Sequence, residues 1–279
     1  MSFSLSELTI YPIKSIQGVT LESSRVEYAG LSGDRRFMLV TPEGQFISGR
    51  EYPSLTLVTA LELDDARWQL NHPETVESCI LDKAQFSPNY KDVVVWDSKV
   101  HGQKTHKKAD AWFSSLIKEP VELMYFGERS QRHTGRRPEM PVAFADGYPF
   151  LLTTQASLDE LNRTCTRTID MAQFRPNLVI QGNKAFEEDS WKRIHIGEVE
   201  FENVKPCIRC IFTTLHPTTA VRVGKGEPLK TLAKFRFLSE KEGITFGVNM
   251  IALNTGMIHL NDPVEVLEYQ EPDHYIDRR

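Results

Sequence analysis

The sequence predicts a β-rich α+β fold built around barrels of short strands. Three observations lead to this expectation. Short runs of β-branched and aromatic residues recur along the 279 residues, with turn-forming residues between them. Only two segments carry the spacing or the start signal of a helix. The composition, 40% hydrophobic and 25% charged, is that of a globular chain long enough for one large domain or two modest ones.

The opening part of the chain reads as strands joined by turns. Residues 37–40 and 45–48 flank a Thr-Pro-Glu-Gly segment at 41–44, so we expect a hairpin there. The Gly33-Asp34-Arg35-Arg36 segment before it is expected to be extended, with the two arginines on opposite faces. The other strand candidates in this part are residues 8–13, 56–63 and 93–96.

Two segments are expected to be helical. Apolar side chains recur at helical spacing in residues 109–117, and Pro120 follows as a stop signal. A capping box that starts at Ser157 and ends at Glu160 indicates a second short helix running to about Arg163. Between these helices, residues 129–137 form a basic loop that nearby prolines keep irregular.

The final hundred residues return to strand patterns. The acidic run at 187–189 is expected to be a solvated loop. No repeat or low-complexity linker interrupts the chain, and many short strands with few helices favour barrel-type packing. The expected strands are residues 177–181, 193–204 around a turn at Gly197, 209–215, 247–253 and 264–269.

Bulk properties exclude several classes of protein. The net charge of −5 disfavours broad nucleic-acid binding, which needs a positive field, but it leaves room for a local basic pocket. No apolar run approaches the ~20 residues of a membrane span. Residues 1–5 lack the basic start of a signal peptide. Four cysteines without an export signal therefore predict reduced thiols in a cytoplasmic protein.

Cys207 and Cys210 form a C-x-x-C pair around Arg209. A neighbouring cation favours the thiolate, which is the form of cysteine that binds metal or acts as a nucleophile. Structural zinc needs about four ligands, and Cys79 and Cys165 do not form a second pair. A thioredoxin-like dithiol starts a helix, whereas residues 211–214 look strand-like. Spacing alone leaves open a metal-ligating thiolate and two small buried residues beside a strand.

Three further motifs place polar side chains at turns. Lys14 and Ser15 follow a strand and can bind an anion, although the glycines of a P-loop are missing. Arg175, before a proline, and Asn177, at a strand start, present donors in a rigid turn. Asp146 lies in an Asp-Gly-Tyr-Pro turn and can accept from a ring N–H. Each motif is also compatible with an ordinary surface turn.

The order of these motifs resembles the MOSC-domain proteins, of the bacterial YcbX type, and is similar to the mitochondrial amidoxime-reducing component. The segments that carry the resemblance span about residues 5–268. They read YPIKS, GDRRFML, FADGYPFLLTTQASLDELN, QFRPNLVIQG, EEDSWKRIHIG and VKPCIRCIFTT. The resemblance implies an N-terminal MOSC β-barrel-like domain over residues 1–125 and a MOSC β-barrel domain with short helices over 126–279.

The resemblance also implies a molybdenum–pterin cofactor, with Cys210 as the metal ligand and the catalytic position. Arg209 would help keep that thiol deprotonated, and cations would offset the charge of a buried phosphate and dithiolene. The residues matching the family's pterin and phosphate contacts are Lys14, Ser15, Arg35, Arg175 and Asn177. Asp146, Gly147 and Tyr148 match a segment that lines the same pocket.

The activity implied by the resemblance is reduction of N-hydroxylated compounds, such as hydroxylamines, amidoximes and 6-hydroxylaminopurine, as a detoxification. The alternative is a cofactor carrier or sulfur-transfer module without turnover of its own. No cysteine follows Cys210, so we expect no C-terminal ferredoxin domain in this chain. Electrons would then come from a reductase or ferredoxin in trans, or the sequence is a piece of a longer chain.

Overall fold

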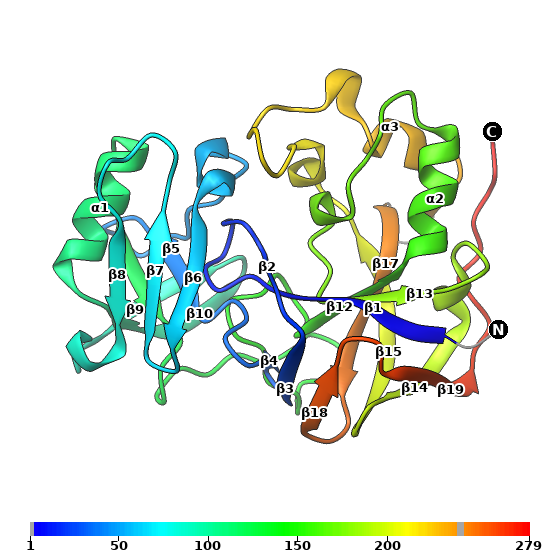
Figure 1. Cartoon of the computed structure of the whole chain (residues 1–279), viewed down its shortest axis with the longest axis horizontal. Helices are drawn as coiled ribbons and strands as arrows, with labels where there is room; N and C mark the ends of the chain where they lie inside the picture. Colours follow the sequence, from blue (N-terminus) through cyan, green and yellow to red (C-terminus); the bar gives the residue numbers. More distant parts are fainter. Residues whose placement is uncertain (1–2, 239–242) are drawn as a thin grey trace.

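The computed structural model describes residues 3–238 and 243–279, so Met1 and Ser2 of the expected first domain lie outside it. Seven strands form a closed barrel, and three smaller sheets lie beside it (Figure 1). The predicted β-rich α+β fold is confirmed. Within the described residues the α-helices are α1 (Lys107–Ile117), α2 (Gln155–Thr164) and α3 (Leu229–Leu232).

The barrel closes because β17 pairs with both β15 and β12, and Phe150 lies opposite Met250 in the closing pair. Only β12 and β13 run parallel; the other neighbours are antiparallel. Around the barrel the order is β12 (Phe150–Thr154), β13 (Leu178–Gln181), β1 (Phe3–Ile10), β19 (Pro263–Tyr269), β14 (Trp191–Ile196), β15 (Val199–Ile208) and β17 (Gly243–Ala252).

One barrel strand comes from the opening residues of the chain. β1 lies between β13 and β19, with Leu8 opposite Leu178 and Phe3 opposite Val264. β2 (Val19–Thr20) pairs with the end of β1, and β16 (Phe237–Leu238) pairs with β17. A small sheet joins β18 (Gly256–His259) to β3 (Ser23–Glu27) and β4 (Gly30–Leu31). Both ends of the sequence therefore build the same barrel.

The blue-to-green half of Figure 1 holds the other two sheets, with α1 packed beside them. One sheet orders β5 (Phe37–Val40), β11 (Glu122–Tyr125), β10 (Ser98–Lys104) and β9 (Tyr90–Val95). The other orders β6 (Thr59–Asp64), β7 (Arg67–Asn71) and β8 (Cys79–Asp82). Short 3-10 turns are η1 (Pro53–Leu57), η2 (Lys83–Gln85), η3 (Met171–Gln173), η4 (Glu187–Ser190), η5 (Ile211–Thr214) and η6 (Gly224–Gly226).

The barrel interior is packed with apolar side chains. Phe150 and Phe201 meet edge to face with ring centroids 5.2 Å apart, and both are almost fully buried. A second cluster lies under α2 and α3, where the rings of Phe174 and Phe246 stack at 3.9 Å. Burying a large side chain of this kind stabilises the fold by roughly 1.5–3 kcal/mol. This packing fixes the strand ends and turns that surround the cavities described below.

The segment at 209–215 is not a strand, and this expectation was wrong. β15 ends at Ile208, and Cys210 is the N-cap of η5. The hydroxyl of Thr213 donates to the Cys210 carbonyl at 3.0 Å, and that of Thr214 donates to the Ile211 carbonyl at 2.7 Å. These local bonds stabilise a turn and override the β propensity of the run. The residues after Cys210 are therefore not a strand that would disfavour a thioredoxin-like dithiol.

Other boundaries differ for local reasons. Helix α2 begins at Gln155 rather than Ser157, because the Thr154 hydroxyl accepts from the Ser157 amide as its N-cap. Residues 45–48 make isolated bridges but no strand, although the turn at 41–44 forms. The stretch 56–63 starts inside η1, and β1 already ends at Ile10. The remaining predicted strands and the helix at 109–117 are confirmed within a few residues.

The acidic run at 187–189 is not a solvated loop, because Glu188 and Asp189 are buried. Asp189 forms a bidentate ion pair with Arg236, at 2.6 and 3.0 Å. Glu188 accepts from the Ser157 hydroxyl at 2.8 and 2.9 Å. Burial, with the nearby Asp189 charge, raises the pKa of Glu188 to about 7. Glu188 and Asp189, which lie in η4, therefore connect this turn to the start of α2 and to the segment before β16.

Replacing Glu188 with glutamine is expected to change how stability depends on pH. A raised carboxyl pKa means that the folded protein holds the proton more tightly than the unfolded chain does. The stabilising contribution of Glu188 to the free energy of unfolding is fully present below about pH 4.5. It is lost as the pH rises to about 7, and the loss is about 3 kcal/mol. Urea unfolding across this range should show that downward slope in the wild type and a flatter profile in Glu188→Gln. The half-buried neighbour provides the control, since Glu187→Gln should keep the wild-type slope.

Candidate functional site

A cavity of about 410 Å³ lies where the turns of the first half of the chain face the barrel. Its size falls within the range of small-molecule and cofactor sites. Its walls come from segments far apart in sequence, including residues 14–15, 46–50, 145–148 and 205–213. All ten residues nominated from the sequence line it, namely Lys14, Ser15, Arg35, Asp146, Gly147, Tyr148, Arg175, Asn177, Arg209 and Cys210.

Lys14 carries the first of the cavity's positive charges. Its Nζ donates to the Phe144 carbonyl at 3.0 Å and forms an ion pair with Asp146. The rings of Phe46 and Trp96 lie 5.5 and 5.9 Å from the same nitrogen. Burial lowers the pKa of Lys14, and Asp146 opposes that shift. The lysine is therefore held in place by a carbonyl, a carboxylate and two rings.

Asp146 is the cavity's only carboxylate among its described lining residues, and its side chain is 75% exposed there. Desolvation by the surrounding residues raises the pKa of Asp146. The charge and hydrogen bond of Lys14, with the Arg35 charge, outweigh this effect and hold that pKa well below its ordinary value. Trp96 also donates its ring N–H to this carboxylate at 3.2 Å. The ring N–H partner expected for Asp146 is thus supplied within the protein.

Arg35 lies in a turn, not on a strand as expected, with φ of 44°. The turn forms because the Asp34 amide donates to the Leu31 carbonyl and the Asp34 carboxylate accepts from the Tyr11 amide at 2.8 Å. Arg35 Nη1 contacts both Asp34 oxygens, at 2.9 and 2.8 Å. Burial raises the pKa of Asp34, and Arg35 opposes that shift. The buried pair fixes the guanidinium at the cavity wall.

Arg175 adopts a left-handed conformation, with φ of 57°, directly before Pro176. Its Nη1 donates to the Ile16 carbonyl at 2.6 Å, and its guanidinium lies 4.0 Å from the Tyr11 ring centroid and 5.5 Å from that of Phe212. Burial, with the nearby Arg35 charge, lowers the pKa of Arg175 to about 10, so it stays cationic at neutral pH. No described carboxylate forms an ion pair with it, which leaves its charge available to an anion.

The side-chain amide of Asn177 is hydrogen-bonded to other residues of the protein. Its Oδ1 accepts from Arg35 at 3.0 Å and from the Leu151 amide at 3.2 Å, while its Nδ2 donates to the Thr9 carbonyl at 3.1 Å. It therefore orients Arg35 rather than offering free donors. Ser15 differs: it is buried, with φ of 79°, and its hydroxyl makes no hydrogen bond to the described residues. Ser15 is free to contact a ligand.

The two cysteines of the C-x-x-C pair have different surroundings. Cys207 lies on β15 and accepts from Arg209 Nη1 at 2.8 Å, while Arg209 Nη2 donates to the Phe174 carbonyl at 2.6 Å. Arg209 therefore contacts Cys207 and not Cys210, contrary to the role expected for it. Cys210 is a free, exposed thiol, without a hydrogen bond to any described residue. Both cysteines line the cavity, and Cys210 is the one whose thiol is exposed and makes no hydrogen bond to a described residue.

Tyr148 and Gly147 complete the nominated set. The Tyr148 hydroxyl accepts from the Arg136 amide at 3.3 Å, and Lys205 lies 5.1 Å from its ring centroid. A Cβ at Gly147 would meet nothing within 4 Å, so the space around it does not demand glycine. The sequence did not nominate Phe46, Arg50, Trp96, Lys205 or Asn249, which also line the cavity. Lys205 opens the cysteine motif, so its position there was an available signal.

The lining is strongly cationic. Asp146 faces six basic residues, which are Lys14, Arg35, Arg50, Arg175, Lys205 and Arg209. Within residues 3–238 and 243–279, no three His, Cys, Asp or Glu side chains cluster in a way that could hold a metal ion by themselves. The arrangement suits an anionic ligand with polar ring edges that can also reach one thiol.

Family models match most of the chain. The MOSC N-terminal beta barrel domain matches residues 2–120, and the MOSC domain matches residues 139–265. The chain is 31% identical to Mitochondrial amidoxime-reducing component 1 of Danio rerio, over 95% of this chain and 85% of that protein. It is equally 31% identical to component 2 of Bos taurus, over 93% and 82%, and to component 1 of Homo sapiens, over 94% and 82%.

Proposed function

Because this chain belongs to the MOSC-domain family that includes the mitochondrial amidoxime-reducing components, we propose that it is a molybdenum-cofactor-dependent reductase of N-hydroxylated compounds. The observation that carries the proposal is the exposed Cys210 thiol in a cavity walled by Lys14, Arg35 and Arg175. A soft thiolate is a suitable ligand for molybdenum, and cations offset the charges of a phosphate and a dithiolene.

The donor set fits the proposed cofactor. Arg175 has no ion-pair partner among the described carboxylates, and the Ser15 hydroxyl has no hydrogen bond there, so both can serve a phosphate. Cys210 offers one protein ligand, which suits a metal that brings its other donors with the pterin. A cavity of about 410 Å³ is large enough for a ligand of this class.

The cofactor would supply two-electron chemistry that takes the oxygen from an N–O bond. In the overall reaction, the N-hydroxylated compound takes up two electrons and two protons and yields the amine and water. Arg35, oriented by Asp34 and Asn177, would hold the anionic part of the cofactor together with Arg175. Lys14 would position the pterin beside Asp146. Exposure of Cys210 leaves the reacting side of the cavity open to substrate.

Substrates would be hydroxylamines, amidoximes and N-hydroxylated bases, reduced as a detoxification in the cytoplasm. A reductase or ferredoxin would supply electrons in trans. The proposed division into domains at residues 125 and 126 assigns β1 to the first part, although its barrel neighbours β13 and β19 lie in the second. None of the described helices has the length and apolar character that crossing a membrane would require.

Metal analysis and turnover test the proposal together. Protein produced in a host that makes the cofactor should contain molybdenum, and with a chemical reductant it should convert benzamidoxime to benzamidine. Zinc without molybdenum would contradict the proposed cofactor. Protein that holds molybdenum but forms no benzamidine would contradict the reductase and favour the carrier or sulfur-transfer alternative. Boiled enzyme with the same reductant corrects for direct chemical reduction.

A further inference from the structure

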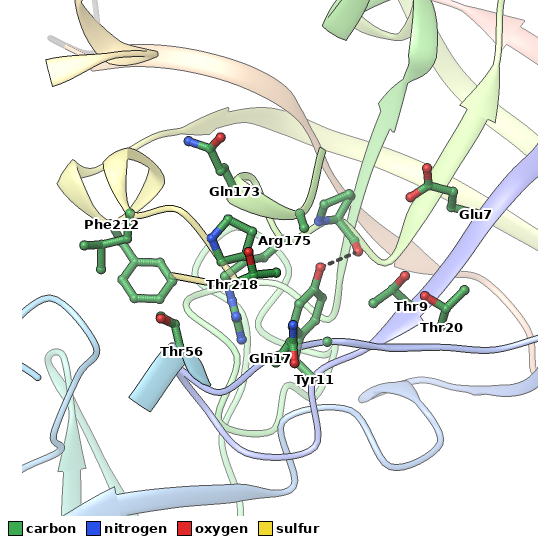
Figure 2. A pocket seen from close by; sticks show the side chains of 15 residues that line it. Glu7, Thr9, Tyr11, Gln17, Thr20, Thr56, Gln173, Arg175, Phe212 and Thr218 are labelled. Carbon is green, nitrogen blue, oxygen red and sulfur yellow. Dashed lines mark hydrogen bonds between the residues drawn. The ribbon is translucent and has the colours of Figure 1, made fainter. Parts of the chain in front are cut away.

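A second cavity, of about 240 Å³, lies next to the proposed cofactor site (Figure 2). The two cavities share only Arg175 and Phe212 among their lining residues, so these side chains form the wall between them. The second cavity is smaller than the ~300–1,000 Å³ of sites for drug-sized ligands, which suits a compound with few non-hydrogen atoms. No role in the cofactor site accounts for it.

The polar end of the second cavity is formed by one face of β1 and β2. Leu8 and Ile10 point into the core, so Glu7 and Thr9 occupy the opposite face of the strand. A register shift between Leu5 and Glu7 sets this alternation. Thr20 lies directly opposite Thr9 in the β1–β2 pair, which brings their side chains together. Figure 2 shows Glu7, Thr9 and Thr20 gathered on one side of the Tyr11 ring.

Glu7 is a half-buried carboxylate without a compensating partner. Within residues 3–238 and 243–279 it forms no ion pair and no hydrogen bond, and burial raises its pKa. The hydroxyls of Thr9 and Thr20 also make no hydrogen bond to the described residues, and Tyr11 donates its own hydroxyl to the Pro176 carbonyl at 3.2 Å. The Glu7 carboxylate therefore accepts from no described residue, and a partly desolvated carboxylate favours a cationic partner.

We propose that this second cavity binds a small organic cation of the amidinium class, held by the Glu7 carboxylate with the Thr9 and Thr20 hydroxyls as further acceptors. A planar amidinium can donate two parallel N–H bonds to one carboxylate, as arginine does. Its remaining N–H groups then face the two threonine hydroxyls. The cavity's own cation does not compete for this end: Arg175 packs against the rings of Tyr11 and Phe212, and Figure 2 shows Tyr11 between the Glu7 side and Phe212.

The choice of an amidinium rests on the proposed function. Reduction of an amidoxime turns a neutral compound into an amidine, which carries a positive charge at neutral pH. Glu7, which forms no ion pair with a described residue, attracts such a product to the second cavity. The second cavity would thus take up the product beside the site that forms it.

Calorimetric titration of the purified full chain with benzamidine tests the inference without turnover. Benzamidine is expected to bind, and benzamide, its neutral analogue of similar shape, is expected to bind at least tenfold more weakly. Glu7→Gln should weaken benzamidine binding at least tenfold, and Thr20→Val should weaken it measurably. Glu22→Gln makes the same change of charge at an exposed position outside the cavity and should bind benzamidine like the wild type.

Three outcomes would overturn the inference: no benzamidine binding, equal affinity for benzamide, or unchanged affinity in Glu7→Gln. Circular dichroism and unfolding midpoints of the variants show whether a loss of binding reflects a loss of fold, and Thr20→Val provides a second, milder perturbation. The reductase proposal fails separately, because it depends on molybdenum content and on the conversion of benzamidoxime to benzamidine. A protein that reduces benzamidoxime but does not bind benzamidine would contradict only the second site.

Discussion

Cys210→Ser is expected to lower the rate of N-hydroxyl reduction by more than about 100-fold, since even changes to groups around a metal's ligands cost ~10–100-fold. The side chain is an exposed free thiol that no described residue binds, so its replacement breaks no internal contact. An alcohol is a harder and far less acidic donor than a thiol, and it does not replace a thiolate on molybdenum. The variant should unfold at the wild-type urea concentration while its activity is lost.

Cys207→Ser is the matched control, three residues earlier in the same motif. Cys207 accepts from Arg209, and a serine hydroxyl can accept the same bond, so we expect activity within a few-fold of the wild type. Molybdenum content, measured on both variants beside benzamidoxime turnover, separates loss of cofactor from loss of chemistry. Equal losses of activity in both variants would contradict a single-ligand role for Cys210.

Asp34→Ala should have the largest effect on stability among changes near the site. The Asp34 carboxylate is 2% exposed and holds Arg35 through two contacts, besides accepting from the Tyr11 amide. Removing one partner of a buried ion pair leaves an uncompensated charge and costs about 3–5 kcal/mol. We expect a lower urea midpoint with an unchanged slope, together with reduced molybdenum content because Arg35 loses its orientation.

A surface pair of the same residue types gives the comparison for Asp34. Asp64 and Arg67 form an ion pair, but their side chains are 42% and 51% exposed. Solvent screens such pairs, so Asp64→Ala should leave the urea midpoint and the molybdenum content nearly unchanged. Asp34→Asn adds a second test, because it keeps an acceptor for Tyr11 and removes only the charge. If Asp34→Ala were as stable as Asp64→Ala, the proposed role of the buried pair would be wrong.

Strand and helix positions were largely predictable where burial follows a period. The helix at 109–117 and the strands near 93–96 and 264–269 appear as expected, because alternation and helical spacing are local signals. Closure of the barrel was not visible in any one segment, since it depends on β1 pairing with β13 and β19. The turn at 211–214 was missed because threonine hydroxyls satisfy the backbone there.

For the site, the sequence nominated residues from separate segments, and only the folded chain shows that they line one cavity. The partners of charged groups were the harder part. Arg209 bonds to Cys207 although Cys210 is its direct neighbour in sequence, and Glu188 and Asp189 are buried although acidic runs are usually solvated. Trp96 and Arg50 reach the cavity from hairpin and loop positions that carry no motif. Side-chain partners depend on contacts distant in sequence, which periodicity does not encode.

The place of β1 in the barrel also constrains when the protein can mature. β1 pairs with residues 178–181 and 263–264, so a ribosome must deliver the chain through at least residue 264 before the ring of strands can close. Such long-range pairing slows folding. The described lining of the cavity extends to Asn249 on β17, so the cavity cannot be complete until most of the barrel strands have been made. Cofactor loading would therefore follow synthesis, and nascent chains that stall before β19 would expose an unpaired edge to aggregation.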